Sequence, residues 1–138
     1  VPSIAEAQRW LQQAKSDLKA AYNDIRHCCP NWVLFKGHQA LEKALVGAAL
    51  CHAEAFEAPV GLMALSQWLE VADPELKGLV EEVEWLHFCG VDDKATQYPS
   101  YHAFPTIPSE AFHSVDEKKV LKWVKRVLSR LQDHVDGV

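Results

Sequence analysis

Apolar residues recur along the first part of the chain at spacings that place them on one side of a helix. They stand alternately three and four positions apart: Ile4, Ala7, Leu11, Ala14, Leu18, Ala21 and Ile25. Because an α-helix turns once every 3.6 residues, this spacing forms one continuous apolar stripe. Ser3 followed by Glu6 is typical of a capping box, so the pattern predicts a helix over residues 3–25. Such a stripe has to be covered by other elements, which favours a fold of packed helices.

A second apolar stripe begins after Pro30, which cannot continue the first helix. Asn31 is the expected cap, and the helix is predicted to run to about Ala53. Its stripe consists of Leu34, Leu41, Leu45 and Ala48, and a row of small residues lies beside it: Gly37, Ala40, Ala44, Gly47 and Cys51. Since small side chains let two helix backbones approach closely, this row is expected to contact the first helix or a partner subunit.

Caps and breaks predict the remaining helices. A short helix is expected over residues 62–71. Asp73-Pro74-Glu75 then provides a cap, a proline for the first turn and an acidic residue beside it, which predicts a helix that runs to about Phe88. Ser114 and Glu117 form another capping-box pattern, so the last helix is expected to begin there and to reach about Val135.

The segment over residues 89–113 combines three prolines with four aromatic residues: Pro99, Pro105, Pro108, Tyr98, Tyr101, Phe104 and Phe112. This composition is too apolar for a flexible linker and too rich in proline for a helix, so it predicts a long ordered loop, often a functional element. The predicted fold class is all-α: an up-and-down helical bundle of four to five helices in a single domain over residues 1–138, with this loop before the last helix.

Composition narrows the functional classes. The chain has 138 residues, of which 49% are hydrophobic and 24% charged, which is typical of a folded soluble domain. No apolar run approaches the roughly 20 residues that cross a bilayer, so no membrane partner is expected. The formal net charge of −5 makes nucleic acid an unlikely partner. The first residues lack the pattern of a signal peptide, and Val1 in place of Met is compatible with a domain excised from a larger protein.

Four cysteines, none in a Cys-x-x-Cys pair, favour a reducing intracellular compartment over a disulfide scaffold, and the predicted localisation is cytoplasmic. Adjacent Cys28 and Cys29 are not expected to bridge each other. Together with His27 they offer soft ligands, but neighbours this close do not converge easily on a tetrahedral ion, so no metal site is predicted. His38 and His52 lie on the stripe of the second helix, either as packed histidines with a hydrogen bond or as polar groups lining a cavity.

Several stretches together resemble the HEPN domain family. They are Trp10 with Asp17 and Leu18, Gln39-Ala40-Leu41-Glu42-Lys43, Gly90-Val91-Asp92, Tyr98-Pro99 and Phe104-Pro105-Thr106-Ile107-Pro108. The last stretch resembles the version at the end of a very large chaperone-like protein. The resemblance implies a helical domain that forms a homodimer, binds a nucleotide such as ATP or GTP and meets protein partners through its larger parent chain. No other cofactor is expected.

Two departures from the family pattern bear on function. Many HEPN proteins are RNases with an Arg-x(4–6)-His motif on the last helix, whereas three residues separate Arg130 from His134 and seven separate Arg126 from His134. The chain is therefore expected not to be an enzyme, and no catalytic residue is assigned. Gln97 stands where the family often has an arginine before Tyr-Pro, so one expected cation is missing.

Basic residues indicate where a nucleotide would bind. One row follows a face of the first helix (Lys15, Lys19, Tyr22 and Arg26) and another a face of the second (Lys36, Gln39 and Lys43). If these rows met, they would form a cationic groove with an aromatic ring for a base. The predicted nucleotide-binding residues are Arg26, Lys36, Lys43, Lys94 and Tyr98. Both rows are equally well explained as solvated faces, and the basic residues of the last helix form a second candidate patch.

Three functions remain open from the sequence. The first is a non-enzymatic, dimerising, nucleotide-binding module of a chaperone-like protein. The second is a purely structural domain for dimerisation or protein docking, and the third, less favoured, is an RNase. Trp10 and Trp123 lie beside their apolar stripes, a position that suits either a dimer interface or a cover over the core.

Overall fold

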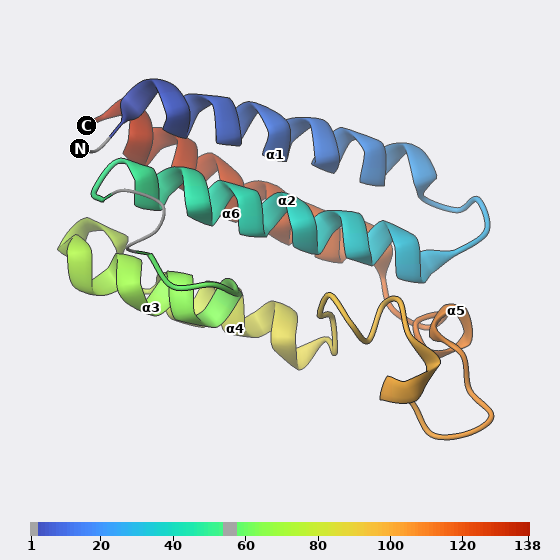
Figure 1. The fold of residues 1–138 in the computed structure, drawn as a ribbon. Coiled ribbons are helices and arrows are strands. Elements are labelled where there is room, and N and C mark those ends of the chain that lie inside the picture. The colour runs from blue at the N-terminus through green and yellow to red at the C-terminus, as the bar shows by residue number, and fades with distance from the viewer. Residues whose placement is uncertain (1–2, 54–57) are drawn as a thin grey trace.

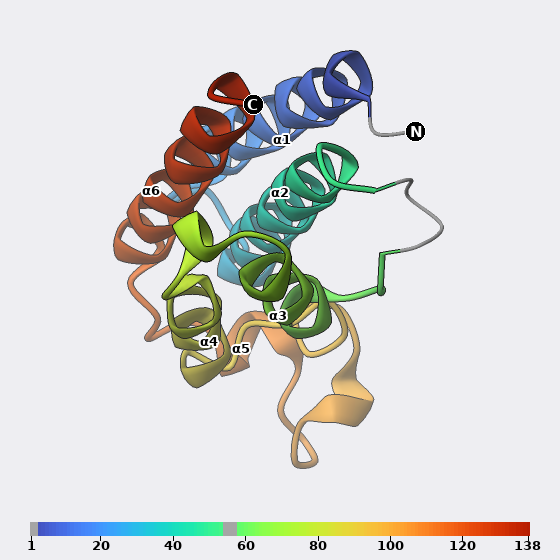
Figure 2. The same cartoon turned by 90° about the vertical axis from the view of Figure 1, so that its left-hand side faces the viewer.

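The computed structural model describes residues 3–53 and 58–138, and every regular element in these ranges is a helix (Figure 1). Three long helices form the centre of the molecule: α1 (Ile4–Asp24), α2 (Pro30–Leu50) and α6 (Glu117–Asp136). Each packs on the other two, and α1 runs antiparallel to both neighbours. A shorter pair, α3 (Leu62–Ala72) and α4 (Leu79–Phe88), covers one side of this trio (Figure 2). The predicted all-α bundle is confirmed.

The first apolar stripe is buried as its spacing predicts. Five of its members on α1 are buried in the core of the bundle: Ala7, Leu11, Ala14, Leu18 and Ala21. Ser3 is the N-cap, and its Oγ accepts a hydrogen bond from the backbone N–H of Glu6 at 3.1 Å. The carboxylate of Glu6 turns instead to Arg9, at 2.7 Å, so only one half of the capping box forms.

The start of α2 corrects one prediction. Cys29 is the N-cap residue, and Pro30 occupies the first turn, where its missing N–H costs no hydrogen bond. Asn31 therefore lies inside the helix. Its buried Nδ2 donates to the carbonyl of Thr96 at 2.9 Å, which ties α2 to the segment before the last helix. The helix also ends at Leu50, before the predicted Ala53.

The row of small residues on α2 serves contacts within the chain. A Cβ added to Gly47 would lie 3.0 Å from the carbonyl oxygen of Ala7 on α1. A Cβ added to Gly37 would lie 2.8 Å from Cδ2 of Leu121 on α6. The predicted contact with the first helix is confirmed, and α6 uses the same row at its other end.

Two predicted caps lead to different elements. Asp73 does act as a cap, since its Oδ1 accepts from the N–H of Glu75 at 2.9 Å, but the helix that follows is the short 3₁₀ helix η2 (Pro74–Leu76). Gly78 then takes φ = 91°, a left-handed conformation that interrupts the helix, and α4 begins at Leu79.

The α6 helix is capped by Asp116, whose Oδ1 accepts from the N–H of Lys119 at 3.0 Å. The Ser114 cap is wrong because α6 starts two residues later than that box requires.

Residues 91–107 are ordered, and we call them the strap. The strap contains the 3₁₀ helix η3 (Pro99–Tyr101) and is followed by the one-turn helix α5 (Pro108–Ala111), neither of which was predicted. Within it the ring of His102 bonds the carbonyl of Ala95 at 2.6 Å. Among the described residues, no helix is both long and apolar enough to cross a membrane.

Candidate functional site

A groove of about 950 Å³ lies between the C-terminal part of α1 and α6. Its lining is Tyr22, Ile25, Lys118, Lys122, Lys125, Arg126, Ser129, Arg130 and Asp133. A hollow of about 380 Å³ continues it along the same seam, shares Tyr22, Lys125 and Ser129 with it, and adds Lys15 and Lys19. We call the two hollows together the α1–α6 groove.

The groove has a cationic wall. Lys118, Lys122 and Lys125 follow each other at steps of four and three, which places them on one face of α6. Within residues 3–53 and 58–138 none of the three lies within ion-pair distance of a carboxylate. The ring of Tyr22 is 38% exposed in the opposite wall, and Asp133 adds one acidic group to the lining. The site therefore combines local positive charge with an accessible aromatic ring.

The two arginines of the groove are held by the fold. The guanidinium carbon of Arg126 lies 5.1 Å from the centre of the Trp123 ring, a cation–π contact. Arg130 pairs with Glu82 of α4 and donates to the carbonyl of Lys77 at 2.7 Å. By contrast, no ion pair among the described residues holds the three lysines of the cationic wall: Lys118, Lys122 and Lys125.

The two residues of α2 that were predicted to bind a nucleotide form ion pairs with α1. Lys36 forms an ion pair with Asp24, and Nζ of Lys43 lies 2.6 Å from Oδ2 of Asp17. They line separate hollows of about 300 and 350 Å³. The two basic rows do not form one groove, because the α1 row that includes Tyr22 faces α6.

The other three predicted residues lie in the α1–α2 turn and in the strap, two segments at the same end of the bundle (Figure 1). Arg26 is in that turn with φ = 66°, and its N–H donates to Oε2 of Glu117 at 3.4 Å. Lys94 is exposed in the strap, and Tyr98 is 50% exposed at the start of η3. The structure does not gather the five residues into one pocket, and their role stays a prediction.

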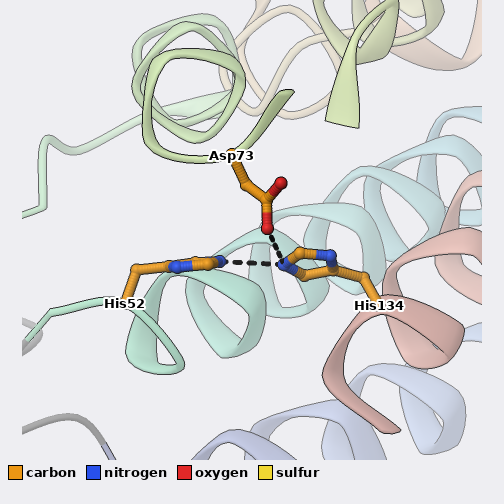
Figure 3. Close-up of side chains that lie close together, drawn as sticks. All are labelled: His52, Asp73 and His134. Carbon is orange, nitrogen blue, oxygen red and sulfur yellow. Dashed lines mark hydrogen bonds and ion pairs between the residues drawn. The ribbon is translucent and has the colours of Figure 1, made fainter. Parts of the chain in front are cut away.

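Three side chains that the sequence did not connect converge at the opposite end of the bundle (Figure 3). His52 follows α2, Asp73 caps η2, and His134 lies in the last turn of α6. The two histidine Nε2 atoms are 2.8 Å apart, and Oδ2 of Asp73 lies 3.9 Å from Nε2 of His134. Burial, and then the neighbouring His134, lower the pKa of His52, which Asp73 partly opposes. No local sequence pattern predicts this cluster, because its members come from three separate elements.

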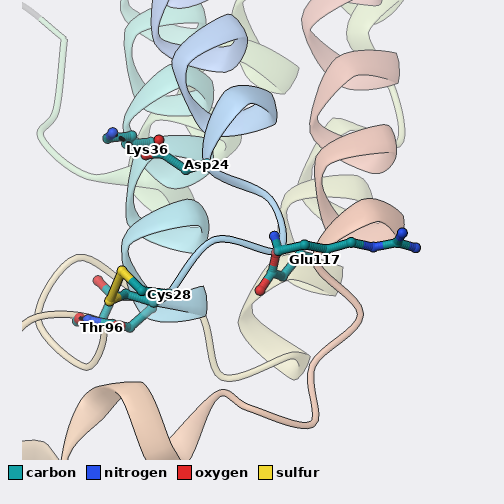
Figure 4. The surroundings of a disulfide bond; sticks show 8 residues. Asp24, Cys28, Lys36, Thr96 and Glu117 are labelled. Carbon is teal, nitrogen blue, oxygen red and sulfur yellow. Dashed lines mark hydrogen bonds and ion pairs between the residues drawn. A yellow bond between two sulfur atoms is a disulfide. The ribbon is translucent and has the colours of Figure 1, made fainter.

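Cys28 and Cys29 form a disulfide in the turn between α1 and α2, so the prediction that these neighbours do not bridge is wrong (Figure 4). The bond joins adjacent residues and links no distant segments. Cys51 and Cys89 are free thiols, and burial raises the pKa of each. Since bonded sulfur atoms offer no thiolate, Cys28 and Cys29 do not provide soft metal ligands in this state.

Trp123 packs within the chain. Its Nε1 donates to the carbonyl of Glu82 at 2.8 Å, and its ring lies 4.8 Å from that of Trp85, which joins α6 to α4. Trp10 is partly buried against the core. Both tryptophans therefore cover the core, and a further role in a dimer interface stays a prediction.

Comparison with known proteins gives two matches. The family model described as HEPN domain matches residues 7–134 of this chain. Human sacsin is 33% identical over 133 residues, a stretch that covers 96% of this chain and 3% of sacsin. The resemblance drawn from the sequence is confirmed, and the chain spans only a small fraction of the length of this relative.

Proposed function

This chain belongs to the HEPN domain family, and we propose that it is a non-enzymatic, dimerising, nucleotide-binding module of a larger, sacsin-like chaperone protein. The observation that carries the nucleotide part is the α1–α6 groove, where three lysines and an exposed tyrosine ring line one hollow. The larger of its two hollows, about 950 Å³, falls within the roughly 300–1,000 Å³ that is usual for small-molecule sites.

The proposed pose follows from the chemistry of the two walls. Lys118, Lys122 and Lys125 are strongly hydrated point charges on flexible stems, which suits them to a mobile triphosphate. The ring of Tyr22 offers a flat apolar face on which a purine base would stack. The net charge of −5 does not oppose this, because interactions with acidic groups elsewhere are screened beyond about 8–10 Å at ordinary salt.

We propose that the domain is not an enzyme because Arg130 and His134 on α6 are both held within the fold. Arg130 pairs with Glu82, and the side chain of His134 is only 3% exposed. An arginine held in an ion pair and a buried histidine support a binding module over an RNase.

Calorimetric titration with ATP and GTP tests the nucleotide site. Replacing Lys122 and Lys125 by Ala is expected to weaken binding roughly 10-fold or more, since a hydrogen bond to a charged group contributes about 1.5–3 kcal/mol. The matched control replaces Lys36 and Lys43 by Ala, which removes two cations and breaks only partly exposed ion pairs. This control is expected to keep its affinity.

Each other outcome has a definite meaning. Loss of affinity in the Lys36 and Lys43 variant alone would return the site to the α1–α2 face predicted from the sequence. Equal affinity in both variants would place the nucleotide elsewhere and end the groove assignment. If neither nucleotide binds the parent domain, the nucleotide part of the proposal is wrong.

A second function, a purely structural domain for dimerisation or protein docking without a nucleotide, is favoured by the strap. Its aromatic and aliphatic side chains stand out into solvent: Tyr98 is 50% exposed, Tyr101 52%, Phe104 97% and Ile107 47%. Large apolar groups gathered on one segment mark an interaction surface. We propose that a second copy of the domain covers this surface, and docking of a different protein is the alternative.

The proposed compartment is the cytoplasm. The chain has only four cysteines, and Cys51 and Cys89 are free thiols. Their state agrees with a reducing environment, and the one disulfide present holds no separate segments together.

A further inference from the structure

We propose that His52, Asp73 and His134 bind a divalent transition-metal ion, with zinc as the best fit. The C-terminal ends of α2 and α6, near which His52 and His134 stand, lie at the opposite end of the bundle from the strap (Figure 1). The site does not depend on the nucleotide proposal. One ligand atom from each residue lies within 4.8 Å of the other two. Two imidazoles and one carboxylate are ligands that zinc takes in proteins, whereas magnesium and calcium prefer oxygen alone.

The distances need only small side-chain movements to accept a metal ion. A tetrahedral zinc with bonds of roughly 2.0–2.2 Å holds its ligand atoms about 3.3 Å apart. The two Nε2 atoms are now 2.8 Å apart, and Nε2 of His134 is 3.9 Å from Oδ2 of Asp73, so the observed values lie on either side of that spacing. Figure 3 shows the ring nitrogen of His52 and the carboxylate of Asp73 both directed at Nε2 of His134.

The backbone already fixes the carboxylate ligand. Oδ1 of Asp73 is used as the cap of η2, where it accepts from the N–H of Glu75 at 2.9 Å. Its other oxygen, Oδ2, is directed at the histidine pair and is available to bind as a single ligand. His52 is partly exposed, which gives an ion and a water molecule in the fourth position a route from solvent.

The buried ring of His134 gives a second, independent indication of a metal ion. Its side chain is 3% exposed, and Nδ1 has no hydrogen-bond partner among the described residues. Oε2 of Glu75 lies 3.8 Å from this atom, just beyond bonding distance, on a side chain that is 77% exposed and free to move closer. A histidine that binds metal through Nε2 carries its proton on Nδ1 and usually donates it to a carboxylate. Metal binding therefore gives this buried atom the partner it lacks.

The proton balance is simple. The close approach of the two Nε2 atoms requires one imidazole to carry its proton there and donate it to the other. When the metal takes its place between them, that proton moves to Nδ1 of the same ring. Both histidines bind as neutral ligands, and Nδ1–H of His134 donates to the carboxylate of Glu75.

Titration of the untagged domain with zinc chloride tests the site. We expect one ion per chain, a rise in melting temperature with zinc concentration, and a cobalt complex with tetrahedral d–d absorption but no thiolate charge-transfer band. The last feature separates this site from the cysteines. Because His134 is buried and its replacement risks unfolding, the informative variants are His52→Gln and Asp73→Asn, the latter of which keeps the capping oxygen.

Loss of a residue that only hydrogen-bonds a metal ligand usually lowers metal affinity roughly 10–100-fold, and Glu75→Gln is expected to lower zinc affinity roughly 10-fold. His52→Gln and Asp73→Asn each remove a ligand, so they are expected to lower zinc affinity at least as much. The matched control is His87→Gln, an exposed histidine on α4, which is expected to bind zinc as the parent does. Unchanged zinc affinity in His52→Gln and Asp73→Asn would overturn the proposal. So would a cobalt spectrum with thiolate bands, or no binding at micromolar zinc.

Discussion

Single side chains join elements that are far apart in the sequence. Oδ1 of Asp136, near the end of α6, accepts hydrogen bonds from Nε2 of Gln8 at 2.8 Å and from Nε2 of Gln132 at 2.9 Å. The bonds to Gln8 and then Gln132 lower the pKa of the Asp136 carboxyl below its ordinary value of 3.8. A lowered pKa means that the unfolded chain holds a proton more readily than the folded one. The contribution to stability is therefore present above pH 3.8 and is lost as the pH falls through the folded-state pKa.

Asp136→Asn tests this linkage. The amide keeps an acceptor oxygen but not the charge, so the variant is expected to be less stable than the parent at neutral pH, with a difference that disappears in acid. Urea unfolding at several pH values measures it. Asp133→Asn serves as the control, because that side chain makes no hydrogen bond within the described residues. A difference that stays constant across the pH range would contradict the prediction.

At the scale of helices, packing distance between α1 and α2 is set by the small row on α2. Gly47 faces the backbone of α1, and a Cβ added there would lie 3.0 Å from the carbonyl oxygen of Ala7. Backbone atoms inside a helix pair shift less easily than the end of a side chain. The small residues on α2 thus set the distance between α1 and α2, and with it how deeply the apolar stripe of α1 is buried.

Gly47→Ala is expected to destabilise the domain although alanine is the better helix former. The helix gain is about 1 kcal/mol, and overpacking of a tight contact costs about 1–3 kcal/mol. We expect a net loss near 1 kcal/mol, seen as a melting temperature lower by roughly 2–5 °C. Gly137→Ala, where an added Cβ is 3.4 Å from its nearest neighbour, should leave the melting temperature unchanged. Greater stability of Gly47→Ala would show that the helices separate without cost.

The sequence predicted the elements better than the ends and contacts between them. The stripes of α1, α2 and α6 follow from local periodicity, which needs no knowledge of partners. The cap at Asn31 failed because the helix begins one residue earlier, at Pro30, and the Asn31 side chain bonds Thr96, 65 positions away. The site shows the same limit: each basic row was visible, but that Tyr22 faces α6 depends on how three helices pack.

At the scale of the whole molecule, the exposed strap bears on oligomeric state. Its apolar side chains lie on a segment held in place at Thr96 by Asn31, so they are presented by a fixed backbone. A surface of this kind is covered at low cost in conformational entropy. This order favours the strap as the face where two copies meet.

Light scattering after size exclusion is expected to give the mass of a dimer for the parent domain. Phe104→Asp is expected to give a monomer, because it places a charge on the most exposed apolar group of the strap, 97% accessible, without touching the core. Val71→Asp is the matched control: it is 87% exposed on α3 and should remain dimeric. A parent that is monomeric at tens of micromolar would exclude the dimer, and a dimeric Phe104→Asp would move the interface away from the strap.

The antiparallel arrangement of α1 and α6 has a mechanical consequence. The start of α1 and the end of α6 lie side by side, joined by the bond between Gln8 and Asp136 (Figure 1). A stretching force applied at these two points would act across the seam and not along it. It would peel one helix from the other contact by contact, beginning at that bond, in place of shearing all contacts at once. Under tension applied at these two points, the domain would therefore open progressively from this end and would yield at low force.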